Sequence, residues 1–521
     1  MKEAGGNWVR WGHCAAGPEM IEACDELGLM VEQPGLDGES DTVKAAWRLR
    51  ASGFRDMIIY YRNDPAILIW EGGNQKVTHE HAQELRGYMD KYDPHGGRAY
   101  AHRRADQTDG DFMDVCIGTE GGCELKKLPV VEGEYDREES PRRVWDDYSP
   151  PNFGYPEAAG RSDYILTSEQ YAVNELPQYM KKIGMPQHCG GANWIFSDTT
   201  SGGRDAAEVD RAGGEVDGER LPKEAYYVCS AMFDTRVPQV HIIGHWTYPA
   251  GTKKPIYVAA NRDRVELFVN GKSLGCGHKD PDGPYIFTFA NVTWEPGEIK
   301  AVAYSGGKAV ATHAIQTAGP AVALRMTPIT NPNGGLRADG SDILLIDVEA
   351  VDSKGERCPT FQQRVDFETI GEGIWRGGYN SGKTNSINNT YLDLECGINR
   401  VAVRATQTAG KITVKATCKG LKSATLTVKS SPVKVENGYA MALPVMPAVT
   451  LPNDRPSPMA DLEQMDVLPR RSVQAGKFIT DISYSGPTSG IRVVEGAQDG
   501  KKILLDRDDL FSALPGVLQG A

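Results

Sequence analysis

The pattern of hydrophobic residues changes near residue 236 of this 521-residue chain, and that change limits the possible folds more than any other feature. Before it, short apolar segments alternate with longer helix-like segments, which predicts parallel strands joined by crossover helices. The expected strands number one fewer than in a closed (β/α)8 barrel, so the first half is interpreted as a TIM barrel that lacks its first strand. The expected strands cover residues 8–10, 29–32, 67–70, 99–102, 115–117, 130–131 and 192–194, and the expected helices cover residues 18–27, 80–92 and 168–183.

After residue 236 the pattern is all-β. The apolar run 265–269 is followed by Asn270-Gly271, the strongest short signal for a hairpin, because both positions accept a positive φ. Clear strands follow at 299–304, 343–348 and 412–416, and turns recur roughly every ten residues, which predicts two Ig-like β-sandwiches in tandem. The expected fold class is therefore multidomain, α/β followed by all-β. The expected domains are a barrel over residues 1–236, sandwiches over 237–318 and 319–433, and a Pro-rich linker with a partial β-rich module over 434–521.

Composition excludes several classes of function. The chain carries 57 Lys and Arg against 70 Asp and Glu, a net charge of −13. This argues against nucleic acid or an anionic membrane as a partner, since both require a basic surface. No apolar run approaches the ~18 residues that span a bilayer. The ten cysteines form no C-x-x-C pair, and no phosphate-binding loop is present, so neither a metal site nor a cofactor is expected.

Polar residues gather where the expected strands end. In a barrel these ends meet at one face, and the chemistry of barrel enzymes lies there. The sequence therefore predicts one polar site at that face. Its candidate members are Arg10, His13, Glu32, the run from Glu71 to Gln75, the run from His102 to Arg104, Glu134, and the run from Trp194 to Asp198.

One segment carries a specific resemblance. Residues 62–75 read Arg-Asn-Asp-Pro-Ala-Ile-Leu-Ile-Trp-Glu-Gly-Gly-Asn-Gln, and they belong to an ordered set of blocks that also includes residues 1–13, 24–29, 129–135 and 191–194. This set resembles the barrel of glycoside hydrolase family 2, which includes β-galactosidases, β-glucuronidases and β-mannosidases. Segment 62–75 is similar to its fourth strand, 129–135 to its seventh and 191–194 to its eighth. With the hairpin region after the barrel, the resemblance covers roughly residues 1–430.

The resemblance implies a retaining exo-β-glycosidase that acts on the terminal β-linked sugar of an oligo- or polysaccharide by double displacement. β-Galactosides are the first expectation and β-glucuronides the second. Glu134 is implied as the nucleophile, Asn74 as a ligand of the sugar 2-hydroxyl and Trp194 as a stacking platform. A periplasmic or secreted location is also implied. The other positions implied to hold the sugar are Arg10, His13, His102 and Arg103.

The run His102-Arg103-Arg104 is unusually basic for an acidic chain. It could bind a uronate or a sulfate, since Arg pairs bidentately with such groups. Surface ion pairs with Asp106 or Asp109 are an equally good interpretation.

Position 75 departs from the family, because Gln75 stands where family members carry the acid/base Glu. A retaining glycosidase needs two carboxyl groups roughly 5–5.5 Å apart, and an amide can neither give nor take the proton. Another acid could serve, the change could be engineered, or the chain could be a non-catalytic relative. Glu71 is the nearest replacement, on the same side of the strand but ~13 Å deeper if the strand stays extended. Glu120 and Glu132 are further candidates for the acid. Both are better suited to support neighbouring site residues or to bind a sugar hydroxyl.

The sequence also starts inside the resemblance, without the family's N-terminal sandwich domains and first barrel strand. An open barrel edge exposes unpaired backbone groups. The chain is therefore expected to be a fragment, or one subunit of a split enzyme whose second chain supplies the missing part. A non-catalytic carbohydrate-binding protein is the alternative from another functional class.

Overall fold

The computed structural model describes most of residues 1–433 and one hairpin further on. The described residues are 1–36, 41–74, 77–105, 112–118, 128–135, 138–149, 166–183, 187–199, 211–279, 281, 283–332, 334–381, 388–433, 491–494 and 502–505. The chain divides into two units, residues 1–448 and 449–521.

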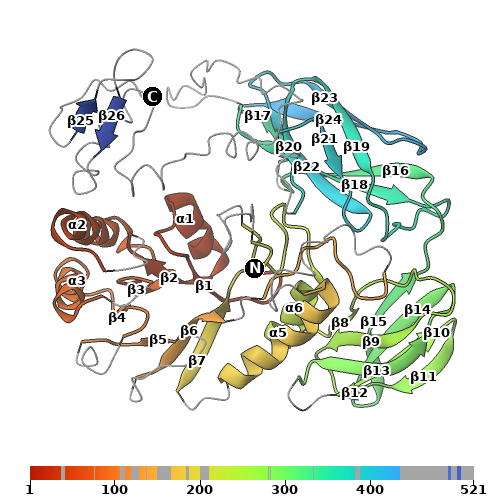
Figure 1. Cartoon of the computed structure of the whole chain (residues 1–521), viewed down its shortest axis with the longest axis horizontal. Coiled ribbons are helices and arrows are strands. Elements are labelled where there is room, and N and C mark those ends of the chain that lie inside the picture. Colours follow the sequence, from red (N-terminus) through yellow and green to blue (C-terminus); the bar gives the residue numbers. More distant parts are fainter. Residues whose placement is uncertain are drawn as a thin grey trace. The chain divides into compact units, whose positions relative to one another are not determined.

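The first half contains a four-stranded and a three-stranded parallel sheet, with the strands in chain order (Figure 1). An isolated parallel bridge between Arg103 and Ile117 continues from the end of β4 to β5. β7 lies beside β1, although no hydrogen-bonded register joins these two strands in the described part of the chain. The bounds are β1 Trp8–Arg10, β2 Met30–Pro34, β3 Ile67–Glu71, β4 Ala99–Ala101, β5 Cys116–Gly118, β6 Val130–Tyr135 and β7 His188–Asn193.

All the expected strands are present, but two are much longer than predicted: β7, expected at residues 192–194, already starts at His188, and β6 extends further than its apolar pair. The apolar pair at 130–131 continues as β6 to Tyr135, and every residue of β6 is buried. Hydrophobicity alone ends this strand early because Glu132 and Glu134 are charged residues in the protein interior. That burial is the first structural sign that β6 serves a polar site.

Helices lie between the parallel strands. The expected helix α1, Pro18–Leu27, starts at proline and ends at Gly28 with φ 69°, a left-handed cap that glycine adopts without strain. The expected helices α3, His79–Tyr92, and α5, Ser168–Ile183, are also present. The sequence did not predict α2, Lys44–Tyr61, or α6, Glu224–Phe233. Most residues of α6 are buried, so it lacks the polar face that reveals a helical period.

The next region forms a first antiparallel sandwich of two four-stranded sheets, ordered β11-β10-β14-β15 and β12-β13-β9-β8. The predicted Asn270-Gly271 turn joins β10 to β11, and both residues have positive φ, 50° and 78°. Val258, Leu267 and Phe287 pack between the sheets. The bounds are β8 Val240–Ile242, β9 Lys253–Ala260, β10 Arg264–Val269, β11 Lys272–Cys276, β12 His278–Lys279, β13 Ile286–Thr293, β14 Glu298–Ser305 and β15 Lys308–Gln316.

A second sandwich pairs the sheet β16-β18-β22-β20 with the sheet β17-β24-β23-β19-β21. Leu344, Val365 and Val401 are fully buried between them. The fold class, α/β followed by all-β, is confirmed, whereas the predicted domain boundaries remain predictions. The bounds are β16 Ala323–Ile329, β17 Leu336–Ala338, β18 Ile343–Val351, β19 Arg364–Gly371, β20 Gly373–Gly378, β21 Tyr391–Asp393, β22 Ile398–Ala405, β23 Lys411–Thr417 and β24 Ala424–Pro432.

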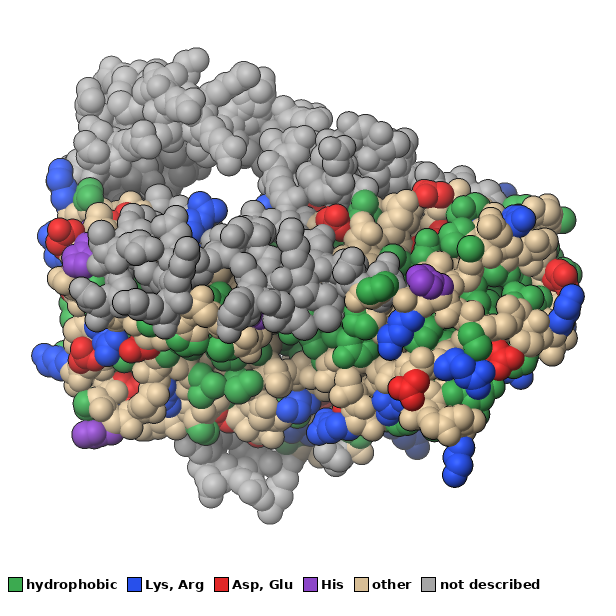
Figure 2. Space-filling view, turned by 90° about the horizontal axis from the view of Figure 1, so that it is seen from below, with side chains coloured by type: hydrophobic (Ala, Val, Ile, Leu, Met, Phe, Trp, Pro, Cys, Tyr) green, Lys and Arg blue, Asp and Glu red, His purple; other side chains and the backbone are tan. Residues whose placement is uncertain are grey.

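Beyond residue 433, the structure describes the hairpin of β25, Ile491–Val494, and β26, Lys502–Leu505. The predicted Pro-rich linker lies outside the described residues. None of the described helices is both long enough and apolar enough to cross a membrane. On the face shown in Figure 2, the described acidic and basic side chains are interspersed with polar and apolar ones.

Candidate active site

Arg10, the last residue of β1, is the centre of a buried polar cluster. Its Nε donates to Oε2 of Glu71 at 2.8 Å and its Nη1 to Oε1 of Glu134 at 3.0 Å. Its Nη2 donates to Oε1 of Glu71 and, at 2.9 Å, to Oδ1 of Asn74. The Arg10 side chain is only 1% exposed. Because a guanidinium carries five donors in a rigid fork, one residue can hold two carboxylates and an amide in a fixed relation.

Glu32 on β2 adds a third carboxyl to this cluster. It is fully buried, and its Oε1 lies 3.4 Å from Nε of Arg10. Desolvation and the neighbouring Glu71 raise the pKa of Glu32 well above its usual range, and Arg10 opposes this only in part. Burial therefore favours the protonated form of Glu32 more than it would in an exposed glutamate.

Glu134 on β6 is held by three side chains from two strand ends, those of β1 and β4. Its Oε1 lies 3.0 Å from Nη1 of Arg103, which follows β4, and 3.4 Å from Nε2 of His13, which follows β1. Arg103 also donates to Oδ1 of Asn74 at 3.2 Å, so Asn74 accepts from both guanidinium groups. The ends of β1, β3, β4 and β6 thus meet at one place, as the polar strand ends predicted.

Trp194 brings the end of β7 to the same site. Its ring lies edge-on to His13, with centroids 4.8 Å apart. Its backbone N–H donates to the carbonyl of Tyr135 at 2.8 Å, which ties it to the end of β6. A Cβ added at Gly12 would lie 2.7 Å from Cζ3 of Trp194. Glycine at position 12 therefore permits the close approach of the indole.

The structure thus brings eight predicted residues together, namely Arg10, His13, Glu32, Glu71, Asn74, Arg103, Glu134 and Trp194. His102 is fully buried next to Arg103 in the chain. The basic run divides, because Arg103 is buried whereas Arg104 is exposed. Gln75, Glu120, Asp106 and Asp109 lie outside the described residues.

The condition behind the predicted depth of Glu71 is not met. β3 ends at Glu71 instead of continuing to position 75, so the extended geometry behind the ~13 Å does not apply. Glu71 and Asn74 both contact Nη2 of Arg10. Glu132 is 1% exposed on the same face of β6 as Glu134. An added Cβ at Gly191 would lie 2.8 Å from Cβ of Glu132, so β7 needs glycine there, and one at Gly118 would lie 3.0 Å from Oε2 of Glu132.

A second buried ion pair lies behind the site. Nζ of Lys223, whose side chain is fully buried, donates to Oδ1 of Asp198 at 2.6 Å and to the carbonyls of Ser140 and Ala212 at 2.7 Å. Desolvation raises the pKa of Asp198 to about 7, with Lys223 opposing the shift. Sequence reasoning placed Asp198 at a strand end but missed Lys223. No local pattern marks it, since its partners lie 11, 25 and 83 residues away.

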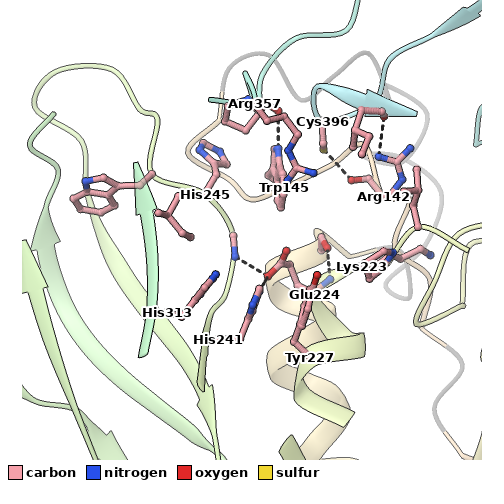
Figure 3. A pocket seen from close by; sticks show the side chains of 18 of the residues that line it. Arg142, Trp145, Lys223, Glu224, Tyr227, His241, His245, His313, Arg357 and Cys396 are labelled. Atoms are coloured by element: carbon pink, nitrogen blue, oxygen red, sulfur yellow. Dashed lines mark hydrogen bonds and ion pairs between the residues drawn. The ribbon is translucent and has the colours of Figure 1, made fainter. Parts of the chain in front are cut away.

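A pocket of about 580 Å³ lies apart from the Arg10 cluster. α6 and both sandwiches line it, and no member of the Arg10 cluster does. Figure 3 shows Tyr227, His241 and His313 on one side, with ring centroids 3.6 Å and 4.5 Å apart along this stack. Oε2 of Glu224 accepts from Nε2 of His241 at 2.9 Å. Among the described residues, no three His, Cys, Asp or Glu side chains are grouped so as to hold a metal ion.

Comparison with known proteins gives the family. Residues 329–427 match the glycoside hydrolase family 2 C-terminal domain 5, and residues 251–311 match a domain of unknown function, DUF4982. A protein of Formosa agariphila named beta-glucuronidase is 44% identical over 99% of this chain and 53% of its own length. The beta-galactosidase BoGH2A of Bacteroides ovatus is 33% identical over 42% of this chain and 25% of its own length.

A solved structure, that of a beta-glucuronidase from glycoside hydrolase family 2, superposes with a TM-score of 0.80 at 47% identity. The match covers 85% of this chain and 47% of that one. A beta-glycosidase from Bacteroides vulgatus shares the fold at 22% identity, with a TM-score of 0.66. The chain belongs to glycoside hydrolase family 2. It spans about half the length of its Formosa relative.

Proposed function

We propose that this chain contains the active site of a retaining exo-β-glycosidase whose substrates carry a terminal β-glucuronide. The single observation that carries the proposal is Glu134, where two guanidinium groups and an imidazole converge on one carboxylate oxygen. The 44% identical relative named beta-glucuronidase favours a glucuronide over the galactoside that the sequence placed first.

Glu134 acts as the nucleophile in this proposal. Its carboxylate attacks the anomeric carbon, a glycosyl ester forms, and the bond to the leaving oxygen breaks. Arg10 and Arg103 both donate to Oε1 and thereby fix the orientation of the carboxylate before the sugar arrives. Asn74 lies between the same two guanidiniums, in reach of a hydroxyl next to the reacting carbon. Trp194 provides an aromatic surface for the sugar ring.

Proton transfer to the leaving oxygen is the weak point, because Gln75 cannot supply it. Glu71 is unsuited to the task, since Arg10 binds both of its oxygens. We assign Glu71 and Glu32 the role of fixing Arg10. Substrates whose leaving groups depart without protonation should therefore react far faster than natural glycosides.

The parallel strands suit a (β/α)8-type barrel that has one strand fewer in this chain. The order β1 to β7, the bridge from β4 to β5 and the nearness of β7 to β1 support this interpretation. We retain the domain limits of 236, 318 and 433 as part of the proposal. Polysaccharide ends are the proposed partners.

The test uses 2,4-dinitrophenyl 2-fluoro-β-glucuronide, with the corresponding galactoside in parallel. The dinitrophenolate departs without an acid, so Gln75 does not block the first step. Intact mass should show one added 2-fluoroglucuronyl group, and peptide mapping should place it on Glu134. Glu134→Gln should abolish the label. Glu132→Gln, two residues away on the same face of β6, is the matched control and should keep it.

Faster labelling by the galactoside would overturn the substrate class but not the mechanism. A label on another carboxylate would overturn the role of Glu134. If neither sugar labels a chain whose circular dichroism shows it folded, the enzymatic proposal fails. Binding of unmodified glucuronides would then support the carbohydrate-binding alternative.

A further inference from the structure

The segment that follows β6, residues 138–149, has almost no regular structure and yet is deeply buried. Residues 139–146 are all buried, including Arg142, Arg143 and Asp146. Buried irregular backbone and charged side chains need partners for their polar groups. This post-β6 segment finds many of them in the two sandwiches, between 102 and 257 residues ahead in the chain.

Arg142 ties the post-β6 segment to the second sandwich. Its Nη1 donates to the carbonyls of Glu395 at 2.6 Å and Ile398 at 3.2 Å, at the start of β22. Sγ of Cys396 donates to the carbonyl of Arg142 at 3.0 Å. Trp145 adds a hydrogen bond from Nε1 to the carbonyl of Pro359 at 2.8 Å. Figure 3 shows Arg142, Trp145 and Cys396 together among the residues that line the pocket of about 580 Å³.

Arg142 also reaches towards the loop of Trp194. Its Nε donates to Oδ2 of Asp217 at 2.7 Å. The backbone carbonyl of Asp217 accepts from Oγ of Ser197, three residues after Trp194. A single guanidinium thus joins the segment after Glu134, the turn beside Trp194 and the second sandwich.

Asp146 ties the same segment to the first sandwich. Its Oδ2 accepts from Nζ of Lys254 on β9 at 2.7 Å and from the hydroxyl of Tyr248 at 2.6 Å. Its Oδ1 accepts from the backbone N–H of Tyr148 and of Ser149, which folds the end of the segment around the carboxylate. Asp146 and Lys254 have side chains only 1% exposed. A buried ion pair of this kind tolerates little displacement, since either partner alone would be an uncompensated charge.

The start of the post-β6 segment is connected to the site through Lys223. Nζ of Lys223 binds the carbonyl of Ser140 and Oδ1 of Asp198. These two residues follow Glu134 and Trp194 by six and four positions. A shift of the post-β6 segment is therefore passed to the strand ends that carry the nucleophile and the stacking indole.

We propose that Arg142 and Asp146 are positioning residues for Glu134, and that through them both C-terminal sandwiches set the geometry of the active site. The inference rests on the proposed function. It gives the sandwiches a role in the reaction rather than only that of spacers.

The test measures the rate of covalent labelling by 2,4-dinitrophenyl 2-fluoro-β-glucuronide, which reports on Glu134 without the proton donor. Arg142→Met and Lys254→Met are the principal variants. Lys254 lies outside the post-β6 segment, so its replacement leaves the sequence around the nucleophile unchanged. Each should slow labelling at saturating reagent by about tenfold or more, since small misplacements of reacting groups are costly. The apparent affinity for the reagent should change less than the rate.

Two controls separate positioning from loss of stability. Leu344→Ala removes core volume from the second sandwich without changing the contacts of Arg142 or Asp146. This variant should be labelled at the wild-type rate. Arg325→Met removes an ion pair with Glu349 inside the same sandwich and should do likewise. All rates are compared at a temperature below the unfolding transition of every variant. Arg142→Lys should recover part of the rate, because it keeps the charge and loses the fork.

A double variant distinguishes loss of the Asp146–Lys254 ion pair from general destabilisation of the fold. Asp146→Asn combined with Lys254→Met should be slowed no more than the slower single variant, because Lys254→Met alone already removes the ion pair that Asp146→Asn weakens. Multiplied effects would overturn the proposal, as would folded Arg142→Met and Lys254→Met proteins that label as fast as Leu344→Ala. An unlabelled wild-type chain would instead count against the proposed function, so the two failures are distinguishable.

Discussion

At the scale of the residue, the site depends on the chemistry of one guanidinium. Arg10 binds Glu71 with two nitrogens and still reaches Glu134 and Asn74. A lysine ammonium could not hold the same set of acceptors, because its donors lie on one atom. Several site residues could be predicted singly from their place after apolar strands. Their contacts could not, since Arg10 and Glu134 lie 124 residues apart.

Replacing Gly12 by alanine tests how closely Trp194 approaches the turn that bears His13. The added Cβ would lie 2.7 Å from the indole, so the ring must move. We expect kcat/KM on an activated glycoside to fall by up to about 100-fold, as ångström-scale displacements do in active sites. Tryptophan fluorescence should shift as well. Gly87→Ala in α3, where nothing lies within 4 Å, is the control and should leave both unchanged. Unaltered kinetics in Gly12→Ala would show that Trp194 does not contact the substrate.

At the scale of the element, periodicity predicted strands where one face is buried and the other is not. β18 alternates in this way, and it was recognised from residues 343–348. α6 was missed because it is buried nearly all round. β6 was shortened because its buried glutamates resemble surface residues. Hydrophobic periodicity therefore reveals elements with one buried and one exposed face. It misses a helix that is buried on all sides, such as α6, and it shortens a strand that buries charged site residues, such as β6.

Adjacent residues of β18 provide a test of this alternation. Leu344 is fully buried and Ile343 is 38% exposed. Leu344→Ala should lower the free energy of unfolding of the second sandwich by about 2–5 kcal/mol, because it removes contacts and leaves a cavity. Ile343→Ala should cost less than about 1 kcal/mol, since little of its surface leaves water on folding. Calorimetric unfolding measures both. Equal losses would contradict the observed orientation of the strand.

At the scale of the whole molecule, buried ion pairs join parts that the sequence treats as separate domains. Lys254 on β9 binds both Asp146 and Glu169, the latter in the first turn of α5. One ammonium cannot neutralise two buried carboxylates. Desolvation accordingly raises the pKa of Glu169 to about 7, while Lys254 holds the pKa of Asp146 at about 2.

This arrangement predicts a stability that falls as pH rises through neutrality. The pKa of Glu169 in the folded state, about 7, exceeds its ordinary value of 4.5. Its contribution is therefore complete below pH 4.5 and is lost as the pH rises through 7. The loss should reach about 2–3 kcal/mol in the free energy of unfolding. Asp198, whose pKa is also raised to about 7, acts in the same direction.

Thermal unfolding between pH 5 and pH 8 measures this loss. Glu169→Gln should flatten the decline, because an amide does not titrate and can still accept from Lys254. Glu22→Gln, an exposed change on α1, is the matched control and should follow the wild-type curve. A Glu169→Gln protein with the full wild-type pH dependence would place the titrating group elsewhere.

The sequence by itself determined the two halves of the fold, the parallel strands of the first half, three of its helices, the family, and the polar strand ends that form the site. These follow from local periodicity and from motifs that short segments carry. Only the tertiary structure decided which charges meet. It placed Glu71 on Arg10, buried Glu32 beside the same guanidinium, and joined Arg142 to a carbonyl 253 residues away. Such contacts depend on how strands and sandwiches pack in three dimensions, and no spacing along the chain encodes them.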